Sequence, residues 1–188
     1  GEMNVEQGLE NWRQDILAGA ILPDTLRPDA FSLGRNLAST PGDVVFENQL
    51  FQLIQYRPAT ESVHQNPILL IPAFVNRFYI LDLSGEYSMV RWLVDQGHTV
   101  FLMSWINPTE MLAPYDMTHY VLDGGLAALD QIDRMLPRTR TQLMGYCAGG
   151  VVATLLTAWL KARGEDRIAS LSLLTTLLDY SDPGPLGQ

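Results

Sequence analysis

One short segment of this sequence has the residue types and the spacing of a nucleophilic site. Residues 143–150 read Leu-Met-Gly-Tyr-Cys-Ala-Gly-Gly, and Cys147 is the only cysteine among the 188 residues. Gly145 and Gly149 stand two residues before and two residues after it. The pattern Gly-x-Cys-x-Gly is typical of a sharp strand-to-helix turn that presents a nucleophile, here with sulfur in place of the more usual serine oxygen. It predicts attack by a thiolate on an acyl carbonyl, through a covalent intermediate.

The residues around Cys147 suit that role. Glycines relieve crowding at a strained turn, and we expect Gly150 to let the following helix approach the sheet. A helix that begins behind the sulfur places partial positive charge there, which favours the thiolate. The N–H of Ala148 is predicted to be one oxyanion donor, and Phe74 is the preferred second donor, with Ala73 next. The alternative is a structural cysteine, because free cysteine is among the most buried residue types.

The apolar pattern along the chain predicts a sheet that is covered by helices. Strands are predicted at residues 44–46, 50–56, 68–71, 99–105, 141–144 and 168–176. Helices are predicted at residues 4–19, 85–96 (capped by Ser84), 118–136 and 148–163. This alternation implies a parallel sheet, and the first two strands, joined through Glu47-Asn48, imply a leading hairpin. The fold class is therefore α/β, and Cys147 follows the third alternating strand, where the α/β-hydrolase topology has its nucleophile.

A nucleophile in this topology needs an acid and then a histidine base further along the chain. All three histidines precede Cys147. We expect His64 in a solvated loop and His98 at a structural turn, whereas His119, at the start of a helix, is the one best placed to approach the site. None of the three stands where the topology requires the base.

The acids that follow Cys147 are Glu165, Asp166, Asp179 and Asp182. We interpret the first two as residues of a surface loop and the last two as turn and cap residues. The sequence thus predicts a partial α/β-hydrolase fold that lacks its C-terminal strands and cap. Residues 1–43 are interpreted as the end of an N-terminal region or arm, and residues 44–188 as the first part of a truncated catalytic domain.

The composition narrows the classes of function. The net charge of −9 argues against a nucleic-acid-binding protein, whose binding surface is basic. A single cysteine cannot form an intramolecular disulfide, which favours the cytoplasm. The chain has no signal-peptide pattern and no apolar run of the ~18 to 20 residues that cross a membrane. We expect no metal and no cofactor.

Several segments resemble the polyhydroxyalkanoate synthase family, in which cysteine replaces serine in a lipase-box-like motif. The matching segments are residues 31–38, 40–46, 53–56, 76–83, 92–101, 104–108, 145–150 and 174–182. Nearest is the single-subunit class with short-chain substrates. The sequence departs from the family pattern at Ala73 and Phe74, where proline and tryptophan are expected, so the oxyanion loop is expected to differ in shape.

The resemblance implies an acyltransferase that polymerises (R)-3-hydroxyacyl-CoA into polyester and releases coenzyme A. It also implies a homodimer, association with polymer granules, and a catalytic aspartate and histidine that lie beyond this sequence. The chain alone is therefore expected to be inactive as a polymerase. Phe74, Tyr146 and Trp105 are candidates for an apolar surround that excludes water from the thioester. The alternatives are a cysteine esterase or dienelactone-hydrolase-like enzyme, and a non-catalytic granule-associated fragment.

Overall fold

The computed structural model describes residues 2–17, 19, 30–179 and 181. The strands are β1 (Gly42–Glu47), β2 (Phe51–Tyr56), β3 (Ile68–Ile71), β4 (Val100–Trp105), β5 (Thr141–Tyr146) and β6 (Ile168–Leu174). The α-helices are α1 (Glu2–Leu17), α2 (Met89–Asp95), α3 (Met117–His119), α4 (Ala127–Met135) and α5 (Ala148–Ala162). Shorter or wider helical turns are η1 (Phe78–Leu81), η2 (Glu110–Leu112) and η3 (Tyr120–Leu126).

The six strands form one sheet in the order β1-β2-β4-β3-β5-β6. β1, β2 and β4 pair antiparallel, whereas β4, β3, β5 and β6 run parallel. The carboxyl ends of the four parallel strands therefore meet at one edge of the sheet, which we call the carboxyl edge. The predicted leading hairpin and parallel α/β sheet are confirmed, and the architecture is that of a partial α/β-hydrolase fold.

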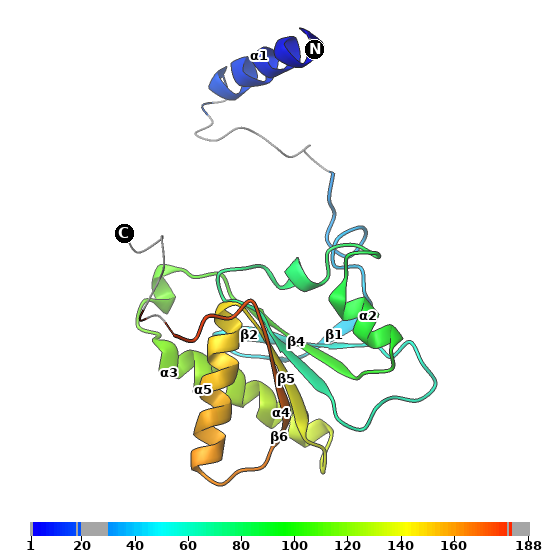
Figure 1. The fold of residues 1–188 in the computed structure, drawn as a ribbon, viewed down its shortest axis with the longest axis vertical. Helices are drawn as coiled ribbons and strands as arrows, with labels where there is room; N and C mark the ends of the chain where they lie inside the picture. The colour runs from blue at the N-terminus through cyan, green and yellow to red at the C-terminus, as the bar shows by residue number, and fades with distance from the viewer. Residues whose placement is uncertain (1, 18, 20–29, 180, 182–188) are drawn as a thin grey trace.

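Both faces of the sheet are covered, which explains the unbroken apolar runs in the sequence. In β3, Leu69 and Ile71 belong to a core shared with α4 and α5, whereas Ile68 and Leu70 belong to a core shared with α2. Figure 1 shows α4 and α5 on one side of the sheet and α2 on the other. A strand buried on both faces is apolar at every position rather than at alternate ones.

The start of α2 corrects one prediction. The helix begins at Met89 with Ser88 as its N-cap, not at residue 85 with Ser84. Ser88 accepts a hydrogen bond from the N–H of Arg91, and its hydroxyl donates to the buried carboxylate of Asp82 at 2.6 Å. Because Asp82 is only 2% exposed and must be hydrogen-bonded, it selects Ser88 rather than Ser84 as the cap.

The predicted helix over residues 118–136 is interrupted by a segment of π-helix, η3. The side chain of Trp105 packs directly on Gly124 in this segment, where a Cβ would lie 2.7 Å from the indole ring. The helix thus widens where it meets the end of β4. π-helical turns of this kind often mark functional sites.

The amino-terminal helix precedes the sheet in the chain. α1 is helical as predicted, and five of its apolar side chains are exposed: Val5, Leu9, Trp12, Ile16 and Leu17. Residues 20–29 lie outside the described part of the chain, and β1 begins at Gly42, inside the range of residues 1–43 that we interpreted as an arm. No helix in the described part of the chain is long and apolar enough to cross a membrane.

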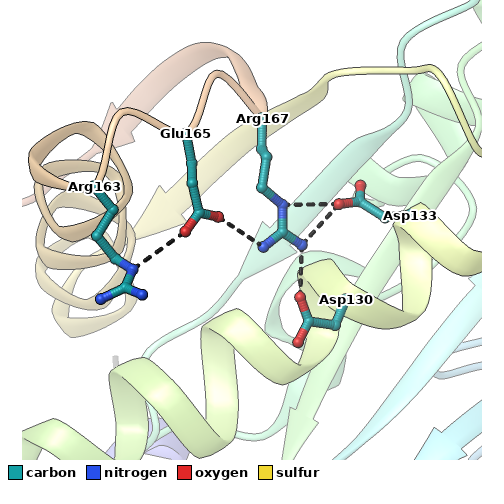
Figure 2. A network of polar contacts seen from close by, with 5 residues as sticks. All are labelled: Asp130, Asp133, Arg163, Glu165 and Arg167. Carbon is teal, nitrogen blue, oxygen red and sulfur yellow. Dashed lines mark hydrogen bonds and ion pairs between the residues drawn. The ribbon is translucent and has the colours of Figure 1, made fainter.

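Arg167, just before β6, ties that strand to α4 (Figure 2). Its guanidinium lies 2.6 Å from a carboxylate oxygen of Asp130 and 2.7 Å from one of Asp133. Burial raises the pKa of Asp133 above its usual value, while the nearby Arg167 acts in the opposite direction. This network lies at the start of β6, so it fastens the end of the sheet that is remote from Cys147.

Candidate active site

Cys147 occupies the sharp turn between β5 and α5, at the carboxyl edge of the sheet. Its backbone angles, φ 52° and ψ −123°, are strained for a residue other than glycine. The residue is exposed, so the alternative of a buried structural cysteine is wrong. A strained, exposed turn with its side chain at the carboxyl edge is the arrangement that the sequence pattern predicts.

Glycines allow three backbone segments to meet around this turn. At Gly145, a Cβ would lie 2.8 Å from the nitrogen of Gly150, so the end of β5 and the first turn of α5 touch directly. At Gly149, a Cβ would overlap the carbonyl oxygens of Ile71 and Pro72, so α5 also touches the end of β3. Each glycine is required because any side chain there would meet backbone atoms.

Gly150 lies against the sheet, as expected, and has one further neighbour. Its backbone touches Gly145 of β5, and a Cβ on Gly150 would overlap the side chain of Thr176, which follows β6. The turn at Cys147 is also tied to β6 through its backbone. The N–H of Cys147 donates to the carbonyl of Leu174 at 2.9 Å, and its carbonyl accepts from the N–H of Gly150 at 2.9 Å.

The loop after β3 lies beside the first turn of α5. The indole N–H of Trp105 donates a buried 2.8 Å hydrogen bond to the carbonyl of Pro72, and Gly149 packs against the same carbonyl. In a trans peptide the C=O and the next N–H point in opposite directions, so the N–H of Ala73 points away from these neighbours. The N–H of Phe74 donates no hydrogen bond to any other described residue.

Aromatic side chains gather beside this loop. Phe74 and Trp105 both contact Tyr120. The centroid of the Tyr120 ring lies 4.7 Å from that of Phe74 and 5.4 Å from that of Trp105. Sequence reasoning missed Tyr120, although its place at the start of the helix that follows β4 puts it at the carboxyl edge. Tyr146 packs with the core on the α2 face, whereas Phe74 and Trp105 pack with the core on the other face. The predicted apolar surround is thus split between the two faces.

No hydrogen bond joins a histidine to Cys147 within the described residues. The rings of His64 and His98 contact each other, with centroids 4.6 Å apart, at the start of β4 and therefore at the edge opposite Cys147. His119 forms a capping box with Asp116 at the start of α3, where its ring nitrogen Nδ1 lies 2.8 Å from the carboxylate. That contact lowers the pKa of Asp116 below its usual value. None of the three histidines is therefore hydrogen-bonded to the thiol in the described chain.

The acids that follow Cys147 and lie within the described residues occupy loops and turns, as predicted. Glu165 and Asp166 lie between α5 and β6, remote from the carboxyl edge, where Glu165 pairs with Arg167 and Asp166 pairs with Arg140. A hydrogen bond from the side chain of Ser181, and then one from its backbone N–H, lower the pKa of Asp179 below its usual value. Asp182 lies outside the described residues. No group of three potential metal ligands is found in the described part of the chain.

Comparison with known proteins identifies similar sequences along the whole chain. Residues 1–93 match the family model described as "Poly-beta-hydroxybutyrate polymerase (PhaC) N-terminus". The chain is 42% identical over 186 residues to the poly(3-hydroxyalkanoate) polymerase subunit PhaC of Cupriavidus necator. It is 34% identical over 179 residues to poly(3-hydroxyalkanoate) polymerase 1 of Ectopseudomonas oleovorans. These alignments cover 99% and 95% of the chain but only 31% and 32% of the two relatives.

Solved structures support the fold alone. The Francisella virulence factor BioJ superposes with a TM-score of 0.57 at 15% identity, covering 98% of this chain and 53% of that one. One of two fungal esterases from Rhizomucor miehei gives a TM-score of 0.53 at 16% identity, covering 74% of this chain and 44% of that one. At such identities the likeness extends to the arrangement of strands and helices and not to the reaction.

Proposed function

This chain belongs to the poly(3-hydroxyalkanoate) polymerase family, and we propose that it carries the nucleophile of an acyltransferase that builds polyester from (R)-3-hydroxyacyl-CoA. It spans about a third of the length of the relatives it matches. Residues 1–43 are assigned to the end of an N-terminal region and residues 44–188 to the first part of the catalytic domain. The polymerase activity belongs to the complete enzyme rather than to these residues alone.

The first step is a thioester exchange at Cys147. The thiolate sulfur attacks the carbonyl carbon of the acyl-CoA, the C–S bond to coenzyme A breaks, and coenzyme A leaves as its thiolate. One thioester replaces another, so the step is nearly balanced in free energy and the acyl group stays activated. The hydroxyl of a second hydroxyacyl group then attacks the enzyme thioester and forms an ester bond. The C–S bond to Cys147 breaks, the cysteine leaves as its thiolate, and the hydroxyl proton passes to a base.

Two backbone N–H groups are assigned to the oxyanion that forms in each step. Ala148 is the first residue of α5, so its N–H has no acceptor within the helix. The second donor is Phe74, since its N–H is unused and that of Ala73 points away from α5. The hydrogen bond from Trp105 to Pro72 holds this loop in place.

Polymer elongation requires a base and an acid at Cys147, which the described residues do not supply. No histidine is hydrogen-bonded to Cys147 in the described chain, so the base and the acid that orients it are assigned to the remainder of the polymerase. Phe74, Tyr120 and Trp105 form an apolar wall beside the loop, which suits a thioester that must be kept from water. Dimerisation, a cytoplasmic location and binding to polymer granules are further parts of this proposal.

The observation that carries the proposal is the strained, exposed Cys147 at the carboxyl edge of a chain that is 42% identical to a polymerase. The test is a product assay on the complete enzyme with (R)-3-hydroxybutyryl-CoA. We expect insoluble polyester and free coenzyme A. Free 3-hydroxybutyrate without polymer would show instead that the protein is a hydrolase.

A further inference from the structure

Thr176 contacts the catalytic turn from a position 29 residues further along the chain. Its hydroxyl lies 3.3 Å from the carbonyl oxygen of Cys147 and 3.1 Å from that of Leu174. A hydroxyl has one proton, so the two carbonyls share a single donor. Because Leu174 also accepts the N–H of Cys147, the hydroxyl closes a small network around the strained residue.

The same side chain fills the space that Gly150 leaves open. A Cβ on Gly150 would come within 2.7 Å of the Thr176 methyl and 2.8 Å of its Cβ. The first turn of α5 is thus held on one side by Thr176 and on another by the end of β3, which Gly149 contacts. The helix that supplies the N–H of Ala148 has little freedom to shift relative to the sheet.

A second strained residue brings Thr176 to this position. Thr175 has φ 47°, a left-handed conformation that is unusual for a β-branched residue. Strain of this kind persists only where surrounding contacts hold it, and it concentrates at functional sites. Here Cys147 is hydrogen-bonded to Leu174 and to Thr176, the residues on either side of the strained Thr175.

We infer that Thr176 is a positioning residue for Cys147, which holds the thiol and the N–H of Ala148 in the alignment that acyl transfer requires. The inference rests on the proposed function of Cys147 as the nucleophile. Acylation needs the sulfur and the oxyanion donor to act together, whereas alkylation by iodoacetamide needs the sulfur alone. A loss of alignment should therefore slow the first reaction and spare the second.

The experiment compares these two reactions in the folded chain and its variants. Thr176→Val keeps the shape of the side chain and removes the hydroxyl, and Thr176→Ser keeps the hydroxyl. Acylation by (R)-3-hydroxybutyryl-CoA at about pH 8, where part of a free cysteine is thiolate, is followed by intact mass. We expect Thr176→Val to be acylated about three- to tenfold more slowly, as befits one lost hydrogen bond, with alkylation changed less than about twofold. Thr176→Ser should be acylated at close to the wild-type rate.

The outcomes separate the two claims. Equal acylation of the wild type and Thr176→Val, or an equal slowing of acylation and alkylation, would overturn the positioning role and leave the nucleophile intact. A wild-type chain that is alkylated but never acylated on Cys147 would overturn the proposed function. If Thr176→Val does not fold, Thr176→Ala takes its place: it removes the methyl group together with the hydroxyl, and a loss of acylation without an equal loss of alkylation again supports the positioning role.

Discussion

Replacing Gly149 by alanine tests whether the helix behind Cys147 is seated on the end of β3. By helix propensity alone, alanine in a helix would stabilise the protein by up to about 1 kcal/mol relative to glycine. In this structure the new methyl group would overlap the carbonyl oxygens of Ile71 and Pro72 and lie 2.6 Å from the carbonyl carbon of Pro72. These are backbone atoms, so α5 or the loop after β3 must shift. Such overpacking costs about 1–3 kcal/mol, so the two expectations have opposite signs.

The assay is urea unfolding of the wild type and the variant, followed by circular dichroism. We expect Gly149→Ala to lower the free energy of unfolding by about 1–3 kcal/mol, and the shifted loop should also slow acylation of Cys147. Gly125→Ala is the matched control, because the nearest atoms to its methyl group would be the ends of two side chains, Leu156 at 3.2 Å and Val152 at 3.5 Å, with no backbone atom closer than 4.0 Å. That control should stay within about 1 kcal/mol of the wild type. A Gly149→Ala variant as stable as the wild type, or more stable, would refute the reasoning.

Three other predictions concern the surroundings of the site. Trp105→Phe removes the buried hydrogen-bond donor to the carbonyl of Pro72. We expect the free energy of unfolding in urea to fall by about 1–3 kcal/mol and acylation of Cys147 to slow. An unchanged acylation rate would contradict a role for this contact. Arg167→Met leaves Asp130 and Asp133 without their partner and should cost about 1–3 kcal/mol. Arg140→Met removes an exposed ion pair with Asp166 and should cost under about 0.5 kcal/mol; equal losses would contradict this difference. Burial and then His64 lower the pKa of His98, so neutral His98 is favoured in the folded chain and stability should fall as the pH drops below about 6.5. His98→Gln should flatten that fall in thermal unfolding, and an unchanged pH dependence would count against it.

Much of the fold can be predicted from the sequence because a strand buried on both faces of the sheet is apolar at every position. Ile68–Ile71 is apolar at every position, and each residue packs into one of two cores. The catalytic turn is also visible, since Gly145 and Gly149 are needed where backbone segments touch. These features depend on local residue type, so a pattern reveals them.

Contacts between segments that are distant in the chain produce no local sequence pattern. The cap of α2 depends on the burial of Asp82, which the residues near Ser84 and Ser88 do not indicate. The π-helical segment depends on the indole ring of Trp105 packing on Gly124. Thr176 lies in a stretch that resembles the family, yet its hydrogen bond to Cys147 could be found only in three dimensions.

The central claim is that Cys147 accepts the acyl group, and the acylated chain can be measured directly. The chain is incubated with (R)-3-hydroxybutyryl-CoA and digested, and the acyl adduct is located by peptide mass spectrometry. Exchange between a thiolate and a thioester needs no base beyond the thiolate, so we predict one hydroxybutyryl group on the Cys147 peptide, one coenzyme A released per chain, and no polymer. The Cys147→Ala variant should carry no adduct. An adduct on another residue, or release of coenzyme A by Cys147→Ala at the wild-type rate, would contradict the account.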